Sequence, residues 1–505
     1  LLEKSRVVSH SMGERTFHSM YALALGAPPE LAAKLSLGEA GQGFSYLMPH
    51  GGSAVMATAV ECTSMFIEVH TALQELLMSA GLPTARADFY WQVLAGVLHL
   101  GQVRFGERGT LADDASRAAL SNVAKLWGLA QELHEDLKRA LLVDVRSFNG
   151  VARTTRRDAA QAKAQADALA KEVYDRLFTA LVHDVGLALG QPPEAESARF
   201  IGLLDIFGFE IFDGGRNRLE QLMINYANDK LQHYFAETAI RTLRRVYESE
   251  IPWMLRDYGL LPSEHAVDAA LELVEGDHAG GPTNVLDRLN DGTKLRKKAE
   301  SGLDESERAA HPDLDNLDMA LFQQLSEDFT GTTTSASSTA RRAFVTKMGG
   351  VWNGHEMSRM TTKQGSTALA LNQLKSAHNQ FAIQHFGALV PYNLTGWVGA
   401  NFDRLDEKLT APLSAASAAT HELFAGAHQP PPSLDRSITE KFRREVSRGF
   451  VDEFGRTIRQ SLLESLQMGT GHFIRCIKPN ALKAKWQFDD APVREQLQAC
   501  GVLEA

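Results

Sequence analysis

The chain has 505 residues, more than a single hydrophobic core usually serves, so two or more subdomains are expected. Its composition, 44% hydrophobic and 23% charged, is that of an ordinary globular protein. A net charge of −10 argues against a general nucleic-acid binder, and no apolar run reaches the roughly 18 residues that a membrane-spanning helix needs. The three cysteines, Cys62, Cys476 and Cys500, are too few for a disulfide framework or a zinc site and favour a reducing, intracellular setting.

Both ends of the chain read as interior sequence. It begins L-L-E-K-S-R-V-V, without an initiator Met or a signal peptide, and it stops at G-V-L-E-A without a polar tail. We therefore interpret the chain as a fragment.

Residues 1–195 are predicted to be mainly helical. Within them, 167–186 carries apolar residues every fourth position, which predicts a helix with one apolar stripe. The stripe consists of Leu169, Val173, Leu177, Leu181 and Val185. Gly186 is placed to end this helix, and 187–197 is a Gly/Pro/Glu linker.

The stretch L-L-D-I-F-G-F-E-I-F, here called the 203–212 segment, is the most informative part of the sequence. The apolar run before it, 200–204, predicts a strand buried on both faces of a mostly parallel sheet. Such a strand delivers Asp205, Gly208 and Glu210 to the edge of the sheet where α/β proteins bind ligands. A carboxylate can hold the water shell of Mg²⁺, and a glycine amide can approach a phosphate closely. The segment is therefore predicted to sense a nucleotide.

Further helices and strands follow the 203–212 segment. Apolar spacing predicts a long helix from Asn217 to about Tyr247, ended by Pro252. Shorter helices are predicted over 284–289 and 314–329, and a low-complexity surface loop over 331–339. Alternation over 381–392 predicts a strand pair, or a strand and a turn, and a Pro/Ser loop over 428–437 precedes a basic helical stretch.

Several blocks, taken in order, resemble the myosin motor domain. They are L-L-E-K-S-R-V-V (1–8) with G-E-R-T-F-H-S-M-Y (13–21), L-A-G-V-L-H-L-G (94–101), D-A-L-A-K-E-V-Y-D-R-L-F (167–178), L-L-D-I-F-G-F-E-I-F (203–212), L-E-Q-L-M-I-N-Y-A-N-D-K-L-Q (219–232), Y-N-L-T-G-W (392–397), H-F-I-R-C-I-K-P-N (472–480) and G-V-L-E (501–504). The resemblance, to an unconventional myosin heavy chain, covers the chain from end to end. The phosphate-binding loop of the family contains Gly-Lys, and this sequence has no such dipeptide.

The resemblance implies an α/β fold: a P-loop NTPase-type motor core, mostly helical with a central mixed sheet, and incomplete at both ends. The phosphate-binding loop, switch I, the converter and the lever are expected to lie outside it. Residues 1–197 would form helices of the upper actin-binding-cleft subdomain, and 198–250 the switch II strand and relay helix. Residues 251–480 would form the lower subdomain with an insertion at 330–380, and 481–505 the start of the helix that leads to the converter.

The resemblance also implies roles in ATP hydrolysis, with ATP and Mg²⁺ as cofactors. Asp205 would hold Mg²⁺ indirectly through water, the Gly208 amide would bind the γ-phosphate, and Glu210 would pair with the switch I Arg. The residues implied to sense the nucleotide and relay its state are Phe207, Phe209, Asn225, Tyr226 and Asn228. The apolar pattern of 217–247 on its own is that of an ordinary core helix.

An actin-binding face is the next implied feature. Between Arg436 and Lys485, eleven basic residues stand against five acidic ones, a net charge of +6, which suits an acidic filament. A solvated charged helix has the same pattern, and the 428–437 loop departs from the basic form of many myosins. The implied contact residues are Arg443, Arg444, Arg448, Arg456, Ile458, Arg459, Leu462, Leu463, Leu466, His472, Phe473, Arg475 and Lys478.

The function implied is an actin-based motor in the cytoplasm and cytoskeleton, with light chains or calmodulin on the absent lever, and with neither nucleic acid nor membrane as a partner. A kinesin would carry D-L-A-G-S-E in place of D-I-F-G-F-E, and a protein kinase would carry V-A-I-K and H-R-D, which are missing. One alternative stays open: a non-catalytic actin-binding or scaffold protein derived from a motor. An intact phosphate-binding loop and switch I Arg upstream of Leu1 would favour the motor.

Overall fold

A computed structural model describes two compact units of the chain. The first unit combines Glu3–Gly202 with Arg404–Glu445, and the second combines Leu203–Asp403 with Val446–Ala505. The residues described are 4–10, 15–38, 43–48, 58–107, 109–148, 151–190, 201–206, 208–212, 217–242, 246, 249–250, 266–276, 284–302, 317–330, 344–345, 380–386, 389–401, 407–416, 420, 423, 466, 469, 471–474, 476–480, 482 and 484–499.

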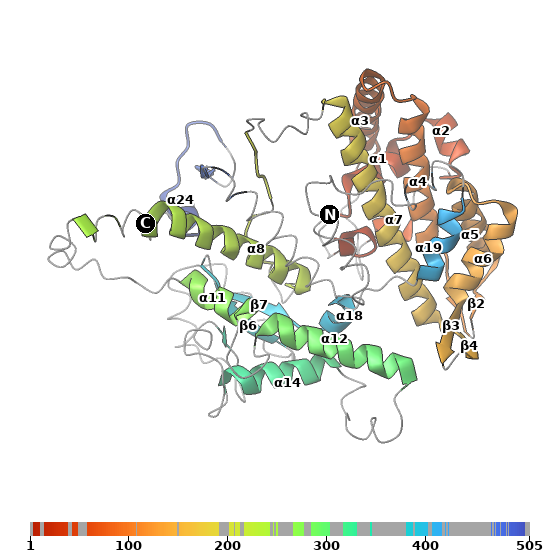
Figure 1. The fold of residues 1–505 in the computed structure, drawn as a ribbon. Coiled ribbons are helices and arrows are strands. Elements are labelled where there is room, and N and C mark those ends of the chain that lie inside the picture. The colour runs from red at the N-terminus through yellow and green to blue at the C-terminus, as the bar shows by residue number, and fades with distance from the viewer. Residues whose placement is uncertain are drawn as a thin grey trace. The chain divides into compact units, whose positions relative to one another are not determined.

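The first unit is helical, with two small hairpins (Figure 1). Its helices are η1 (Lys4–Val7), α1 (His18–Gly26), α2 (Pro29–Lys34), η3 (Ser45–Leu47), α3 (Ala59–Ser79), α4 (Ala85–Gly101), α5 (Asp114–Leu126), α6 (Gln131–Leu142), α7 (Ala159–Ala188) and α19 (Glu407–Ser414). Its strands pair antiparallel as β1 (Phe105–Gly106) with β2 (Thr110–Leu111) and β3 (Val143–Phe148) with β4 (Val151–Arg156).

Helix α4 is the centre of the first unit. Its residues from Val93 to Gly101 are all buried, because α1, α3, α5 and α7 pack around it. Gly96 and Gly101 are required for this packing, since a Cβ at either position would overlap the ring of Trp127 or Tyr46. Leu409 and Leu413 of α19 join the same core, which explains why a segment so late in the chain belongs to this unit.

Helix α7 confirms the predicted helix and its stripe, with one correction at its end. Leu169, Val173 and Leu177 are buried in the core, as the spacing predicts. The helix continues past Gly186 to Ala188, and the glycine with a left-handed conformation is Gly190, whose φ is 76°. Gly186 therefore lies inside the helix, because the chain turns only at Gly190.

The second unit is built around helix α8 (Leu219–Phe235) and a three-stranded sheet. Its other elements are η4 (Ala236–Arg241), α11 (Ala266–Glu275), α12 (Val285–Gly302), α14 (Leu317–Thr330), β5 (Phe344–Val345), β6 (Gln380–Gln384), β7 (Leu389–Asn393), α18 (Trp397–Asn401) and α24 (Asp490–Ala499). The sheet has the order β5-β6-β7 and is antiparallel throughout, with Phe381 opposite Tyr392. It confirms the predicted strand pair over 381–392.

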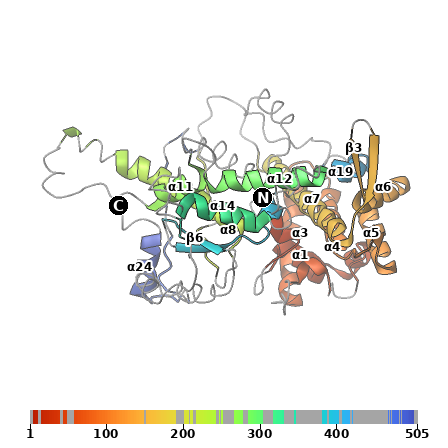
Figure 2. The same cartoon turned by 90° about the horizontal axis from the view of Figure 1, so that it is seen from below.

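Helices α11, α12 and α14 complete this unit (Figure 2). Helix α12 contacts α11, α14 and α18, and a two-pronged ion pair joins α12 to α14: Arg288 Nε lies 2.5 Å from Asp328 Oδ2, and Nη2 lies 2.8 Å from Oδ1. Helices α12 and α14 confirm the helices predicted over 284–289 and 314–329, and α12 runs on to Gly302.

Two predictions need correction. The expected central mixed sheet is absent from the described residues, whose sheets are small and antiparallel. The predicted strand over 200–204 is not formed in its described part: Ile201 is 93% exposed and Leu203 94% exposed. The physical reason is that a strand exists only with a hydrogen-bonded neighbour, and no described strand pairs with these residues.

The long helix predicted from Asn217 changes type before its predicted end. After Phe235 the α-helix passes into η4, a π-helical stretch with wider hydrogen bonding, which is frequent at functional sites. Pro252 and the loops at 331–339 and 428–437 lie outside the described residues. No helix in the described ranges is both long and apolar enough to cross a membrane.

Candidate functional site

The 203–212 segment has an open end and an attached end. Asp205 and Gly208 are exposed, and a Cβ added at Gly208 would meet nothing within 4 Å. From Phe209 onward the segment is half-buried at most positions, because it contacts side chains of α8 and residues beside the sheet. Phe207, predicted to sense the nucleotide, lies outside the described residues.

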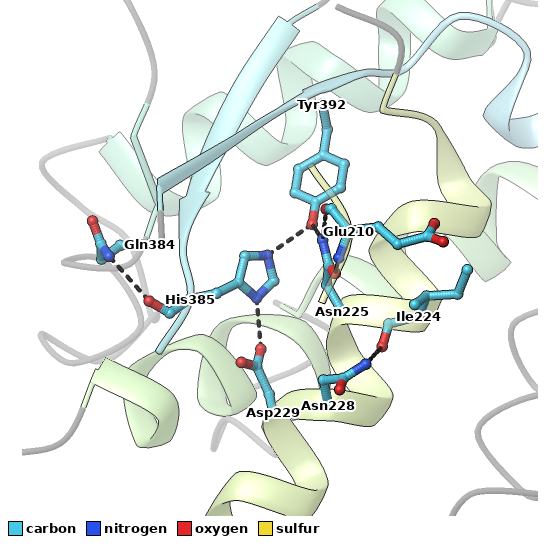
Figure 3. Close-up of polar contacts among 8 residues, drawn as sticks. All are labelled: Glu210, Ile224, Asn225, Asn228, Asp229, Gln384, His385 and Tyr392. Atoms are coloured by element: carbon cyan, nitrogen blue, oxygen red, sulfur yellow. Dashed lines mark hydrogen bonds and ion pairs between the residues drawn. The ribbon is translucent and has the colours of Figure 1, made fainter. Parts of the chain in front are cut away.

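Asn225 of α8 holds the backbone of Glu210 from both sides (Figure 3). The Glu210 N–H donates to Asn225 Oδ1 at 2.7 Å, and Asn225 Nδ2 donates back to the Glu210 carbonyl at 2.8 Å. Asn225 is fully buried. A side chain that pairs both backbone groups of one residue replaces the neighbour that a strand would supply. The Glu210 carboxylate accepts a long contact of 3.5 Å from Gln221 Nε2.

Asn217 performs the same task two residues further along. The Phe212 N–H donates to Asn217 Oδ1 at 2.7 Å, and Asn217 Nδ2 donates to the carbonyls of Phe212 at 3.1 Å and Pro391 at 3.0 Å. The Asn393 N–H donates to the Asn217 carbonyl at 2.9 Å. Asn217 thus joins the 203–212 segment to strand β7 immediately before α8 begins.

A line of buried polar groups continues from Asn225 into the sheet (Figure 3). Asn225 Nδ2 donates to the Tyr392 hydroxyl at 2.9 Å, Tyr392 lies 2.8 Å from His385 Nε2, and His385 Nδ1 lies 2.6 Å from Asp229 Oδ2. All four side chains are fully buried. Burial raises the pKa of Asp229, although His385 and the Phe386 amide act to lower it. Burial also holds the pKa of Tyr392 well above its ordinary value.

Phe209 completes the attachment with ring contacts. Its ring meets His385 edge-on at 5.3 Å between centroids and Phe386 at 5.5 Å. Edge-to-face contacts of this kind contribute about 0.5–1.5 kcal/mol beyond burial. A movement of Phe209 would therefore reach the same imidazole that the polar line contains.

The other two predicted relay residues point to different neighbours. The Tyr226 hydroxyl donates to Glu275 Oε2 of α11 at 2.5 Å, and Glu275 also pairs with Lys230. Asn228 Nδ2 donates to the Ile224 carbonyl of its own helix at 2.9 Å. Among the predicted relay residues on α8, Asn225 is hydrogen-bonded to the 203–212 segment.

The described members of the predicted actin-binding set fall into two groups. His472 and Lys478 are exposed, as a contact face requires. Phe473 and Leu466 instead contact the end of α8: the Phe473 ring lies 4.9 Å from Phe235, and the Tyr234 hydroxyl donates to the Leu466 carbonyl at 3.0 Å. The remaining members lie outside the described residues: Arg443, Arg444, Arg448, Arg456, Ile458, Arg459, Leu462, Leu463 and Arg475.

The metal prediction rests on one carboxylate. In the described part of the chain, no three His, Cys, Asp or Glu side chains gather closely enough to hold an ion. Asp205 is nevertheless exposed beside an open glycine backbone. This donor set fits a hydrated Mg²⁺ that a nucleotide brings with it, since Mg²⁺ keeps several waters and uses few protein carboxylates.

Sequence reasoning missed four residues of this site: Asn217, Asp229, His385 and Tyr392. Asp229 and Tyr392 lie within blocks that were matched to the family, but the apolar pattern singled out only their helix and strand. Asp229 and His385 are 156 positions apart, so no local spacing links them. A His that follows an apolar strand is the one local signal that was available.

Comparison with known proteins identifies the family of the chain. The model of the myosin head (motor domain) matches residues 1–329 and 329–505. The whole chain aligns with human unconventional myosin-Ib at 28% identity and 38% of that protein, and with human unconventional myosin-Va at 28% identity and 24% of that protein. It also aligns with mouse unconventional myosin-XIX at 27% identity and 44% of that protein. The chain thus spans less than half the length of these relatives. Because the family model covers the chain from its first residue to its last, the chain belongs to the myosin motor-domain family.

Proposed function

We propose that this chain is part of an actin-based motor that couples ATP hydrolysis to movement along actin filaments. One observation carries the proposal. The 203–212 segment is exposed where Asp205 and Gly208 lie, and it is fixed to α8 where Asn225 binds Glu210. A segment with one open end and one end attached to a helix is suited to pass a ligand-dependent shift to that helix.

The reaction would use the open end. Asp205 would bind the water shell of Mg²⁺, and the Gly208 N–H would donate to the γ-phosphate. Bound Mg²⁺ would neutralise phosphate charge. The Glu210 carboxylate would pair with an Arg from a segment beyond this chain and enclose the attacking water. Catalysis of this kind depends on positioning and charge stabilisation.

The attached end would transmit the state of the site. Phe207 and Phe209 flank Gly208, so a turn of the backbone there shifts large rings. The Phe209 ring contacts His385, and Asn225 binds Glu210, which supports transmission to α8. At the other end of α8, Tyr234 and Phe235 contact Leu466 and Phe473. A movement of this helix would thereby reach the stretch proposed to bind actin.

Other parts of the proposal follow from family membership. Residues 1–197 would belong to the upper subdomain of the actin-binding cleft, 198–250 to switch II and the relay helix, and 251–480 to the lower subdomain. Residues 330–380 would be an insertion and 481–505 would lead to the converter. The motor would work in the cytoskeleton of the cytoplasm, with light chains or calmodulin bound to its lever. The basic stretch from Arg436 to Lys485 would contact actin.

The test compares this chain with a longer protein. The 505-residue chain alone is expected to show no actin-activated ATP hydrolysis, because it lacks Gly-Lys and with it the phosphate-binding loop of the family. A protein that continues upstream through that loop is expected to hydrolyse ATP, faster with actin. Phosphate release in the presence and absence of filaments is the measurement.

Glu210→Ala in that longer protein is expected to abolish hydrolysis and leave nucleotide binding intact. Glu220→Ala is the matched control, because Glu220 lies on the first turn of α8 and outside the 203–212 segment. Normal turnover in Glu210→Ala would contradict the assigned role. A longer protein that binds actin but never hydrolyses ATP would instead support a scaffold derived from a motor.

A further inference from the structure

Three buried titratable residues beside the site have no part in the proposed reaction. Asp229 lies on α8, His385 directly follows β6, and Tyr392 lies on β7. Each is fully buried, and together they extend from Asn225 into the sheet (Figure 3). A buried polar chain costs stability unless every member has a partner, so its contacts define what it does.

The backbone of Glu210 fixes the direction of every hydrogen bond in this chain. An N–H only donates and a carbonyl only accepts, so Asn225 Oδ1 must face the Glu210 N–H and Nδ2 must face the carbonyl. The second hydrogen of Nδ2 goes to the Tyr392 oxygen at 2.9 Å. Tyr392 therefore donates its own hydrogen to His385 Nε2 at 2.8 Å.

The same reasoning sets the protonation of the last two members. Because His385 Nε2 accepts, the proton of the neutral ring lies on Nδ1 and is donated to Asp229 Oδ2 at 2.6 Å. The hydrogen bonds thus run from Glu210 and Asn225 to Tyr392, then to His385 Nε2, and from His385 Nδ1 to the Asp229 carboxylate. Burial disfavours the phenolate and raises the pKa of Tyr392 well above its ordinary value, so the hydroxyl keeps its hydrogen.

We propose that Asp229, His385 and Tyr392 are positioning residues for the 203–212 segment: they orient the amide of Asn225, and through it they hold the backbone of Glu210. The proposal rests on the proposed function of that segment as the nucleotide sensor. In this role the Asp229–His385 pair does more than fill the core, because it must keep the hydrogen on Nδ1 of His385 and leave Nε2 free to accept from Tyr392.

One added proton breaks the order of this chain. If Asp229 takes it on Oδ2, the ring must accept at Nδ1, and its own hydrogen moves to Nε2. The other oxygen, Oδ1, is buried without a hydrogen bond among the described residues, so it offers a proton nothing to bond. In this arrangement His385 and Asn225 would donate to the Tyr392 oxygen together, and the Tyr392 hydrogen would lose its acceptor.

Charged groups also lie on the described elements that are packed around this pair. On α8 and α11 the nearby charged groups are occupied with one another: Lys230 pairs with Glu275, and His233 Nδ1 lies 2.8 Å from Asp268. From the sheet side the neighbours of His385 are the rings of Phe209 and Tyr392. Protonation of Asp229 is therefore expected to rearrange the hydrogen bonds at Tyr392.

The sign of the pH effect separates local from global loosening. The pKa of Asp229 is raised in the folded chain, so its contribution to stability is fully present below its unfolded pKa and is lost as pH rises through the folded pKa. Acidification through that range therefore favours the folded chain at this residue. A loss of order at Glu210 on acidification would not be explained by Asp229 unfolding the protein.

The experiment measures hydrogen exchange of the Glu210 amide in this chain, with residue-level fragmentation and correction for the intrinsic pH dependence. Tyr392→Phe removes the acceptor of Asn225 and is expected to lower the protection of Glu210 about five- to tenfold at neutral pH, the effect of one hydrogen bond. Tyr226→Phe is the matched control, because it removes an equally buried hydroxyl from α8 that donates to Glu275. It is expected to leave Glu210 protection unchanged.

A pH series provides the second readout and does not depend on whether Tyr392→Phe folds. Glu210 protection in the unsubstituted chain is expected to fall on acidification while amides of α4 stay protected. In Asp229→Asn an amide oxygen still accepts from His385 Nδ1, so neutral-pH protection is expected within about twofold of the original and its acid loss is expected to disappear. Asp229→Leu removes the acceptor of the His385 Nδ1 hydrogen and is expected to lower Glu210 protection as Tyr392→Phe does.

Two results would overturn the proposal: equal loss of Glu210 protection in Tyr226→Phe and Tyr392→Phe, or an acid profile that Asp229→Asn leaves unchanged. The first would mean that loosening α8 anywhere has this effect, and the second that the pair plays no part. Exchange needs no nucleotide, so a longer protein without ATPase activity would count against the proposed function and leave the exchange result to decide this inference.

Discussion

Two buried aspartates show how the partners of a carboxylate decide its ionisation. Asp184 of α7 is 2% exposed and Asp229 of α8 is 0% exposed, so burial acts to raise the pKa of both. At Asp184 this is outweighed by the Tyr90 hydroxyl at 2.5 Å and the Arg86 guanidinium at 2.8 Å, and the pKa is lowered. Asp229 has an imidazole and a backbone amide instead, and its pKa is raised. The Tyr90 hydroxyl is the main cause of the lowered pKa at Asp184, and the Arg86 guanidinium adds to it.

Asp184→Asn is expected to reduce the stability of the first unit by about 3 kcal/mol near neutral pH, because Arg86 loses its buried partner. A lowered pKa stabilises the fold above the unfolded pKa of about 3.9, and this stability is lost as pH falls through the folded pKa. The difference in free energy of unfolding between Asp184→Asn and the unsubstituted chain should therefore shrink below about pH 4. Urea unfolding across that range is the measurement. Asp136→Asn, at an exposed carboxylate of α6, is the control, and a difference that stays constant with pH would contradict the argument.

At the scale of elements, local signals end some segments and distant side chains hold others. Helix α7 begins with a capping box: the Gln161 N–H donates to Asp158 Oδ1 at 2.7 Å, and Gln161 Oε1 accepts from the Asp158 N–H at 3.2 Å. The 203–212 segment has no such device of its own in its described part. Asn217 and Asn225 of the next element hold it instead. Neighbouring residues in the sequence therefore determine where α7 begins, whereas the position of the 203–212 segment depends on the side chains that pack beside it.

Asp158→Ala is expected to destabilise the first unit by about 1 kcal/mol, the usual effect of losing an N-cap. Asp158→Ser keeps an oxygen that accepts from the same N–H, so it should stay within a few tenths of a kcal/mol of the original protein. Thermal unfolding monitored by circular dichroism compares the three proteins. Equal losses for Ala and Ser would mean that the cap hydrogen bond is not the cause.

At the scale of the molecule, each unit has its own hydrophobic core, and the chain crosses between units more than once. One core contains α1, α3, α4, α5 and α7 with Leu409, Leu413 and Leu423, and the other contains α8, α11, α12, α14 and the sheet. The charge is uneven as well, because a chain of net charge −10 contains a stretch of net charge +6 between Arg436 and Lys485. Such a local excess favours encounter with an acidic partner.

The triple variant Arg443→Glu, Arg444→Glu and Arg448→Glu is expected to weaken co-sedimentation of the chain with actin filaments about tenfold or more at low salt, because it reverses charge on the proposed contact stretch. The same three changes at Arg117, Lys125 and Arg139, which are exposed in the first unit, alter the net charge equally and should have little effect. Equal losses of actin co-sedimentation in the two triple variants would show that binding depends on the net charge of the chain and not on this stretch. Binding of the unsubstituted chain should also fall with added salt.

Local patterns predicted the helices well and the site in part. The apolar spacing of α7 and α8 and the alternation of β6 and β7 depend on neighbours within a few residues, and these elements are present. The same patterns failed at 201–204, where Ile201 and Leu203 are exposed, because an apolar run specifies a buried strand only when another strand lies beside it. They also missed η4, since a change from α to π hydrogen bonding leaves no clear periodic signal.

The sequence by itself determined the family, through motifs in a fixed order, and singled out Asp205, Gly208 and Glu210 as the candidate site residues. Only the tertiary structure decided what those residues are attached to. Asn225 holds the backbone of Glu210, and Tyr392, His385 and Asp229 extend that contact across 156 positions of sequence. The physical reason is range: helix periodicity and caps act within one or two turns, whereas a buried hydrogen-bond chain exists only after distant elements have excluded water from it.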